Sequence, residues 1–326
     1  MLIFHSLQEV PADFGPSIVT IGNFDGVHRG HQRVLAELAQ RARQRKARTV
    51  AITFEPHPVR VLRPQQPLPL ITTPEQKLEL LQELGTSPGG LDAVLILPFT
   101  QELSQLSAQE FAQTVLRDTL HALEVHEGEN FRFGHDASAD VRTLASLGAE
   151  LGFTVQTYPA QLWRGVPISS SRIRAAIQQG EMRAARQLLG RPFSILSTPA
   201  PGRGYGARYT VPTINLALYP ELLPANGVYI TCMQIEGERF EAVTNVGNRP
   251  TFGTDSFSVE SHLLRFRPLA LDETTPITLH FLDRIRAEMR WPSPDALKAQ
   301  IARDVACARH YFGLWRSLRS SSTQIL

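Results

Sequence analysis

The sequence lacks three features that mark common protein classes: paired cysteines, an excess of one charge, and long apolar runs. Its two cysteines, Cys232 and Cys307, form no CxxC pair, so we expect no disulfide framework and a cytoplasmic location. The formal net charge of +2, from 33 basic and 31 acidic residues, predicts no nucleic-acid partner. We expect no signal peptide, and because no uncharged apolar run reaches about 18 residues we expect neither a transmembrane helix nor a membrane partner.

The signatures of two enzyme classes are absent as well. The sequence has no GxSxG turn for a serine hydrolase, and no HExxH or CxxC cluster to bind zinc. These absences disfavour nucleophilic and zinc-binding roles for His28 and His31, which stand three residues apart. Two interpretations of the pair remain open, namely ordinary surface histidines or hydrogen-bond donors to an anionic ligand.

The first half of the chain alternates between apolar runs and amphipathic segments. Apolar, β-branched runs predict strands at residues 17–24, 48–54, 92–99, 122–131 and 153–159. Apolar residues at helical spacing predict helices between them, with Thr73 and Ser107 as helix N-caps. Strict alternation of strand and helix predicts a doubly wound parallel sheet, in which ligands bind beyond the carboxyl ends of the strands.

The pattern changes near residue 187. From there, short alternating runs are separated by Gly and Pro roughly every 8 to 12 residues, which is typical of an antiparallel barrel or sandwich. A closing helix is predicted from Ser293 or Pro294. We therefore predict an α/β domain at residues 1–187, a small antiparallel β-barrel domain with a C-terminal helix at 188–314, and a flexible tail at 315–326.

The segment GNFDGVHRGH, residues 22–31, joins the first predicted strand to the following helix. Backbone N–H groups and the positive end of that helix would point at a ligand, which suits an anion. His28 and His31 would lie on one side of the first turn and can donate hydrogen bonds to phosphate oxygens. Gly30 would let a ligand approach the backbone closely. An HxGH tetrapeptide after a strand indicates the nucleotidyltransferase superfamily.

A second candidate anion site is PISSSRIR, residues 167–174. A capped helix start alone would explain the serines. Arg172 and Arg174 near the start of that helix would oppose its macrodipole, which favours an anionic ligand such as a triphosphate.

These motifs, together with others in the same order, resemble the bacterial bifunctional riboflavin kinase/FAD synthetase family. They are VTIGNFDGVHRGHQ, TFEPHP, LPF, EGENFRFG and ISSSRIR in the first half, then LLGRPFSI, VPTINL, GVY, NVGNRPTFG, VESHLL and DALKAQIARDV. The resemblance covers roughly residues 17–310. It implies two Mg²⁺-dependent reactions on small-molecule partners. The C-terminal domain would phosphorylate riboflavin with ATP to FMN, and the N-terminal domain would adenylylate FMN with ATP to FAD, releasing pyrophosphate.

In the N-terminal domain, the resemblance implies that His28, His31 and Arg174 bind and stabilise the ATP phosphates. It places further ATP contacts on Gly22, Asn23, Phe24, Asp25, Gly30, Asn130, Ser170 and Ser171. It also implies a flavin-side loop at Pro56, His57 and Pro58. A rigid proline turn would explain His57 equally well.

In the C-terminal domain, Thr213 and Asn215 match residues that bind Mg²⁺ and nucleotide phosphate, and their oxygen atoms suit that cation. Glu260 matches the general base for the riboflavin 5′-hydroxyl, although the strand pattern alone would make it an outward-facing residue. The resemblance further implies a phosphate loop with Gly202, Gly204 and Gly206. It also implies a structural or flavin-side turn at Arg249, Pro250 and Thr251.

The chain departs from the family in the kinase half. Thr210 and Ile214 stand where the family has glycine and alanine beside the phosphate loop. If that glycine needs a positive φ, a β-branched residue there would strain the loop. Two alternatives therefore stay open: a monofunctional FAD synthetase with an impaired kinase domain, and a non-catalytic flavin or nucleotide sensor.

Overall fold

The computed structural model describes residues 1–66, 68–86, 90–200, 213–249, 256–265, 269 and 271–322. The chain divides into two compact units, Met1–Ser170 and Ser171–Leu326. Neither of the described parts has a helix that is both long and apolar enough to cross a bilayer.

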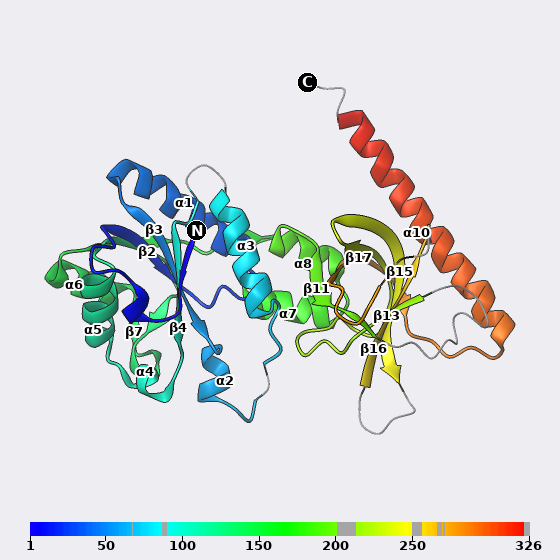
Figure 1. Ribbon diagram of the computed structural model, residues 1–326, viewed down its shortest axis with the longest axis horizontal. Helices are drawn as coiled ribbons and strands as arrows, with labels where there is room; N and C mark the ends of the chain where they lie inside the picture. The colour runs from blue at the N-terminus through cyan, green and yellow to red at the C-terminus, as the bar shows by residue number, and fades with distance from the viewer. Residues whose placement is uncertain are drawn as a thin grey trace. The chain divides into compact units, whose positions relative to one another are not determined.

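The N-terminal unit is built on a six-stranded sheet in which all five strand pairs are parallel (Figure 1). In spatial order the strands are β1 (Leu2–Phe4), β4 (Ala93–Pro98), β3 (Arg48–Glu55), β2 (Ser17–Ile21), β5 (Ala122–Gly128) and β8 (Thr154–Tyr158). The predicted doubly wound parallel sheet is confirmed. β1 was not predicted, because its three residues are too few to show a pattern.

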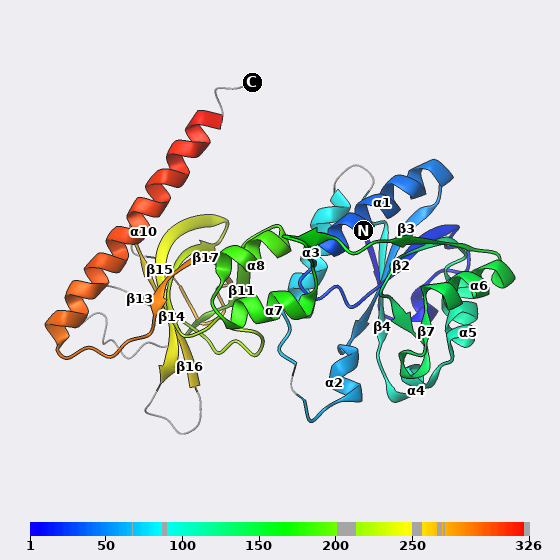
Figure 2. The ribbon, with the colours of Figure 1, turned by 180° about the vertical axis from the view of Figure 1, so that it is seen from behind.

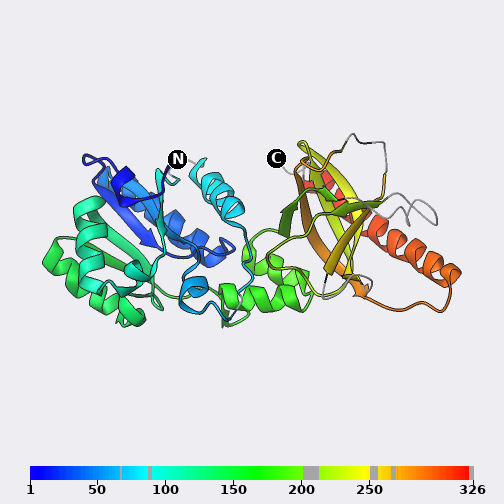
Figure 3. The same cartoon turned by 60° about the horizontal axis from the view of Figure 1, so that its bottom comes forward.

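Helices cover both faces of this sheet (Figure 3). α1 (Arg29–Arg45) and α3 (Pro74–Thr86) pack on one face, where Leu38, Leu81 and Val94 are fully buried. α5 (Ala108–Phe111), its π-helical continuation η2 (Ala112–Thr119) and α6 (Val141–Leu151) cover the other face. Successive residues of β4 alternate between these two apolar cores, as the two-residue period of a strand requires.

Shorter elements complete the N-terminal unit. They are η1 (Leu7–Glu9), α2 (Pro58–Leu62), α4 (Gln101–Gln105), β6 (Arg132–Phe133), η3 (His135–Ala137), β7 (Ala139–Asp140), β9 (Leu162–Trp163) and β10 (Val166–Pro167). The predicted helix caps are confirmed. The Thr73 hydroxyl accepts the Gln76 N–H at 3.3 Å, and Ser107 and Glu110 form a reciprocal capping box.

The carboxyl edge of the sheet includes the point where the chain reverses its direction of winding. β3 and β4 follow β2 on one side, whereas β5 and β8 lie on its other side. Pairing of β2 with β5 ends at Val19 and Val125, so the two strands separate toward their carboxyl ends. Such a switch point opens a crevice for a ligand.

The C-terminal unit is a curled antiparallel sheet of seven strands (Figure 2). In spatial order they are β11 (Phe193–Ser197), β17 (Ile277–Ala287), β14 (Gly227–Ile235), β15 (Glu238–Arg249), β16 (Ser256–Leu263), β13 (Thr213–Leu216) and β12 (Pro199–Ala200). The helices α7 (Ser170–Gln178) and α8 (Met182–Leu189) precede the sheet, and α10 (Pro294–Ser322) follows it. This agrees with the predicted antiparallel domain and closing helix.

α10 packs its Ala308 and Phe312 against Val228, Ile230 and Val243 of the sheet. The helix begins at the predicted position, where the Ser293 hydroxyl accepts the Ala296 N–H at 3.2 Å. It also runs through residues 315–322, where we predicted a tail. Leu, Arg and Trp are adequate helix formers, so the helix continues past its last buried turn.

Candidate active sites

Three cavities are lined by many of the residues that the sequence singled out. Two lie in the N-terminal unit at the carboxyl edge of the sheet, and one lies in the C-terminal unit. We call the first the α1 cavity. It has a volume of about 370 Å³ and is lined by the end of β2, the start of α1, the end of β5 and the segment after β8, including Gly22, Phe24, His28, Gly30, His31, Glu127, Asn130, Tyr158 and Ser170.

The rings of His28 and His31 stack on one another at the N-terminus of α1. Their ring centroids are 3.6 Å apart with an interplanar angle of 14°, and Phe24 meets the edge of the His31 ring at 5.2 Å. His28 is the N-cap of α1, and its Nδ1 accepts the His31 N–H at 3.3 Å. Because Nδ1 is an acceptor, the neutral His28 ring carries its proton on Nε2, which can donate to a ligand.

Gly30 makes this stacking sterically feasible. A Cβ at position 30 would lie 3.1 Å from Nδ1 and Cε1 of the His28 ring. The sequence suggested that Gly30 opens the backbone to a ligand. The structure shows in addition that it leaves room for the neighbouring imidazole.

The turn before α1 is held in an unusual conformation. Phe24 and Val27 have φ values of 49° and 38°, in the left-handed region that non-glycine residues rarely adopt. The buried Asp25 carboxylate accepts the N–H groups of Ile71 and Thr72 at 2.9 and 3.2 Å and so anchors the turn. The residues that line the α1 cavity do not include Asp25, whose carboxylate binds these backbone N–H groups.

Glu127 occupies the gap that opens between β2 and β5. Its Oε1 accepts the Ile21 N–H at 2.6 Å, in place of the backbone pairing with β5 that ends at Val19. The side chain is 3 % exposed and lines the α1 cavity. Burial raises the pKa of Glu127 well above its usual range, although the hydrogen bonds from Ile21 and Thr20 oppose this. Glu127 is the first residue of the motif EGENFRFG, but it was not singled out as a candidate site residue, because a lone glutamate in a predicted strand has no recognisable spacing.

The second cavity, which we call the phenylalanine cavity, has a volume of about 650 Å³. Five phenylalanine rings line it, those of Phe54, Phe99, Phe111, Phe131 and Phe133. Phe54 and Phe99 meet edge to face at 5.6 Å, and Phe131 and Phe133 stack at 5.5 Å. Such a wall suits a planar aromatic ligand.

Sequence reasoning overlooked these phenylalanines as functional residues. A signal was present, because Phe54, Phe99 and Phe131 each stand at or just after the carboxyl end of a predicted strand. The carboxyl ends of parallel strands meet at one edge of a sheet, which brings the three rings together.

The α1 and phenylalanine cavities share part of their lining. Ile21, Gly22, Asn130 and Phe131 border both. Asn130, which the resemblance singled out, therefore lies at the junction between the two cavities.

Other predicted residues of the N-terminal site are spread more widely. Asn23 and Pro58 line the phenylalanine cavity, and the Ser170 hydroxyl donates to the Asp25 carbonyl at 3.0 Å. His57 caps α2, since its Nδ1 accepts the Val59 N–H at 3.2 Å, which is the structural alternative that the sequence left open.

Pro56 precedes this capped turn and is exposed. Ser171 and Arg174 lie on α7 within the second compact unit. Arg174 is the fifth residue of that helix, near its start as predicted.

The third cavity, the sheet cavity, lies in the C-terminal unit and has a volume of about 400 Å³. Thr213, Asn245, Glu260 and His262 line it from three adjacent strands. Asn215 is directly opposite Glu260 in the β13–β16 register, as Asn245 is in the β15–β16 register, so these side chains share one face. The structure thus brings Glu260 to Thr213 and Asn215, although it lies far from them in the sequence.

The opposite wall of the sheet cavity is more apolar. Trp291, Leu297 and Ile301 contribute to it, and Arg286 lies over the Trp291 ring at 5.4 Å from its centroid. The Arg286 Nη2 donates to the buried Asp304 carboxylate at 2.9 Å, which fixes the guanidinium in place.

Several predicted residues of the kinase half lie outside the described residues. They are Gly202, Gly204, Gly206, Thr210, Pro250 and Thr251. Arg249 is the last residue of β15, and only its backbone is described.

Comparisons with known proteins agree on the family. The FAD synthetase family matches residues 10–172, and the riboflavin kinase family matches residues 189–312. A bifunctional riboflavin kinase/FMN adenylyltransferase from Pseudomonas fluorescens is 35% identical over 311 residues, 95% of this chain and 97% of its own length. The enzyme of the same name from Escherichia coli K12 is 35% identical over 312 residues, 95% of this chain and 96% of its own length.

The fold is found in a solved structure as well. A crystal structure described as a macrolide-efflux protein from Streptococcus pneumoniae aligns with a TM-score of 0.85 at 27% identity, covering 94% of this chain and 98% of the other. The sequence relatives cover both units from end to end, and both family matches occur in the order that the motifs indicated. The chain therefore belongs to the bifunctional riboflavin kinase/FMN adenylyltransferase family, with its FAD synthetase domain preceding its riboflavin kinase domain.

Proposed function

We propose that this chain phosphorylates riboflavin to FMN in the sheet cavity, and that it joins FMN to the AMP part of ATP across the two N-terminal cavities. ATP binds in the α1 cavity and FMN in the phenylalanine cavity. The observation that carries this assignment is the lining shared by the two cavities at Ile21, Gly22, Asn130 and Phe131, because a product that joins both substrates needs adjoining sites.

In the adenylyltransferase reaction, an FMN phosphate oxygen attacks the α-phosphorus of ATP. The bond between the α-phosphorus and the pyrophosphate oxygen breaks, and pyrophosphate takes up the negative charge. Nε2 of His28, together with His31 and the N-terminus of α1, donates to the phosphate oxygens on which charge develops. Asn130, at the junction, orients the two reacting phosphates.

In the kinase reaction, Glu260 accepts the proton of the riboflavin 5′-hydroxyl as its oxygen attacks the γ-phosphorus of ATP. The Trp291 wall holds the flavin ring. Thr213 and Asn215 of β13 offer a hydroxyl and an amide oxygen beside Glu260, a donor set that suits Mg²⁺. When bound there, Mg²⁺ would neutralise charge on the ATP phosphates.

The experiment that tests this proposal offers the purified chain ATP and Mg²⁺ with either riboflavin or FMN. We expect riboflavin to give FMN and then FAD, and FMN to give FAD. FAD from FMN without any product from riboflavin would identify a monofunctional FAD synthetase. Binding of either flavin without turnover would identify a sensor. Each of these last two outcomes contradicts the proposal.

The wider biochemical setting follows from the same assignment. We propose that the partners are the small molecules ATP, riboflavin and FMN, with neither nucleic acid nor membrane involved, and that the enzyme works in the cytoplasm. Two free cysteines, Cys232 and Cys307, are consistent with a reducing compartment.

A further inference from the structure

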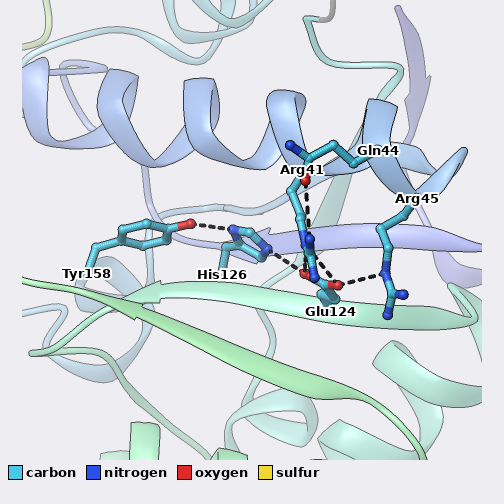
Figure 4. A network of polar contacts seen from close by, with 6 residues as sticks. All are labelled: Arg41, Gln44, Arg45, Glu124, His126 and Tyr158. Carbon is cyan, nitrogen blue, oxygen red and sulfur yellow. Dashed lines mark hydrogen bonds and ion pairs between the residues drawn. The ribbon is translucent and has the colours of Figure 1, made fainter.

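A buried polar network lies between α1 and the end of β8 (Figure 4). Its centre is Glu124 on β5, whose side chain is fully buried. Arg41 and Arg45 of α1 each donate from Nε to this carboxylate at 2.8 Å. Nε2 of His126 lies 3.4 Å from the same carboxylate, and the Tyr158 hydroxyl lies 2.8 Å from His126 Nδ1.

The direction of every hydrogen bond in this network can be derived from Glu124. Burial alone would raise the pKa of Glu124, but the hydrogen bonds from Arg41 and His126 and the charges of the two arginines together lower it. The carboxylate is therefore ionised and can only accept. Nε2 of His126 must then carry a hydrogen, which it donates to Glu124.

His126 in turn determines the direction of the Tyr158 hydroxyl. Burial lowers the pKa of His126, although Glu124 opposes this, so the ring is neutral and its Nδ1 is a bare acceptor. Burial raises the pKa of the Tyr158 phenol, which keeps its proton. Tyr158 therefore donates to His126, and the only hydrogen-bonding capacity left on its oxygen is as an acceptor.

Tyr158 is part of the α1 cavity wall, together with Pro159, Ala160, Gln161 and Ile168. This wall has few donors to offer. Pro159 has no N–H, the Ala160 N–H donates to Glu129 Oε1 at 3.0 Å, and the Ile168 N–H donates to the Gln161 carbonyl at 2.8 Å. The Gln161 Oε1 is buried and finds no hydrogen-bond partner among the described residues. The acceptors on this wall, the Tyr158 oxygen and the Gln161 Oε1, suit a ligand edge that supplies hydrogen-bond donors.

We propose that Tyr158, oriented by Glu124 and His126, accepts a hydrogen bond from the six-amino group of the purine base and so selects ATP over nucleotides with a carbonyl at that position. The proposal rests on the assignment of ATP to the α1 cavity. The wall formed by Tyr158 and Pro159–Gln161 has no charged side chain, which suits the base rather than the phosphates. A six-carbonyl would place one acceptor against another and leave both unpaired.

The test measures FAD formation from FMN with three triphosphates: ATP, purine riboside triphosphate, which has hydrogen at position six, and inosine triphosphate, which has a carbonyl there. In the wild type we expect kcat/KM for ATP to exceed that for purine riboside triphosphate by roughly three- to tenfold, the value of one hydrogen bond, and inosine triphosphate to be poorer still. In Tyr158→Phe, kcat/KM for ATP should fall to the value for purine riboside triphosphate, and that second value should stay unchanged.

A second variant probes the orientation of the hydroxyl. In His126→Leu the Tyr158 hydroxyl loses its acceptor and can donate its proton into the cavity instead. The use of inosine triphosphate relative to ATP should therefore rise, which a loss of packing alone would not produce. Gln44→Ala is the matched control, because exposed Gln44 accepts from Arg41 at 3.2 Å without contacting Glu124 (Figure 4). It should keep wild-type selectivity.

Riboflavin phosphorylation by the same chain is the internal control for folding, since its cavity lies in the other unit. Unchanged discrimination between ATP and purine riboside triphosphate in Tyr158→Phe would overturn the proposal. Failure of the underlying ATP assignment has a different signature. In that case FAD synthesis would persist in a His28→Ala/His31→Ala variant, whatever Tyr158→Phe did.

Discussion

The two candidate sites in this chain are assembled in opposite ways. In the N-terminal unit the proposed phosphate-binding groups come from one turn of chain, where His28 caps α1 and stacks on His31. In the C-terminal unit Thr213 and Asn215 come from β13 and Glu260 from β16, and they meet through the antiparallel register of these two strands. A helix start creates a site by local geometry, whereas a sheet creates one by alignment, so the second kind depends on the pairing of the strands.

The largest expected effect is on the site of the C-terminal unit. Glu260→Gln removes the proton acceptor while keeping the shape of the side chain. FMN formation from riboflavin should fall about 100- to 10,000-fold. FAD formation from added FMN should remain at the wild-type rate, and both products can be followed by chromatography. An equal loss of both activities would mean that the two sites are not separable in this way.

The corresponding change in the N-terminal unit is His28→Ala/His31→Ala. Loss of donors to the developing phosphate charge should lower kcat for FAD formation by about 100- to 1000-fold. Phosphorylation of riboflavin should be unaffected, so FMN should accumulate in a coupled assay. Wild-type FAD synthesis by this variant would refute the assigned role.

A smaller effect is expected from Gly30→Ala. The added methyl would lie 3.1 Å from the His28 ring and displace it, so kcat/KM for FAD formation should fall roughly tenfold or more. Gly313→Ala is the matched control, because nothing lies within 4 Å of a Cβ at this exposed position in α10. It should leave both activities intact and raise stability by up to about 1 kcal/mol in thermal unfolding.

The smallest effect concerns stability and its dependence on pH. Burial raises the pKa of Glu127, so the folded state keeps a proton that the unfolded chain releases. The resulting stabilisation is complete below the unfolded-state pKa and is lost as pH rises toward the folded-state value. Glu127→Gln should remove this loss. Its Tm relative to the wild type, measured by calorimetry, should therefore increase between pH 5 and pH 8; a constant difference would argue against a protonated Glu127.

The features that could be predicted from the sequence are those that depend on neighbouring residues. The alternating strands and helices, the caps at Thr73 and Ser107 and the histidine turn are all encoded within a few residues, and they were predicted correctly. The resemblance placed Asp25 among the ATP contacts, but nothing in the sequence indicated that its carboxylate accepts the N–H groups of Ile71 and Thr72, more than forty residues away. Local sequence carries no information about such a contact.

Long-range polar groups were the least predictable part. Glu124, His126 and Glu127 look like ordinary polar residues in a strand, because their roles depend on α1, β2 and β8 being folded around them. The phenylalanine cavity is an intermediate case. Its rings stand at strand ends that the sequence identified, but only the parallel order of the strands brings them side by side.

The wall shared by the two N-terminal cavities has a kinetic consequence. FAD formed at the lining shared by Ile21, Gly22, Asn130 and Phe131 would occupy both cavities until it dissociates. FAD should then compete with ATP and with FMN alike. Release of FAD, rather than bond formation, would limit the rate whenever FAD accumulates. FAD would thus inhibit its own synthesis without a separate regulatory site.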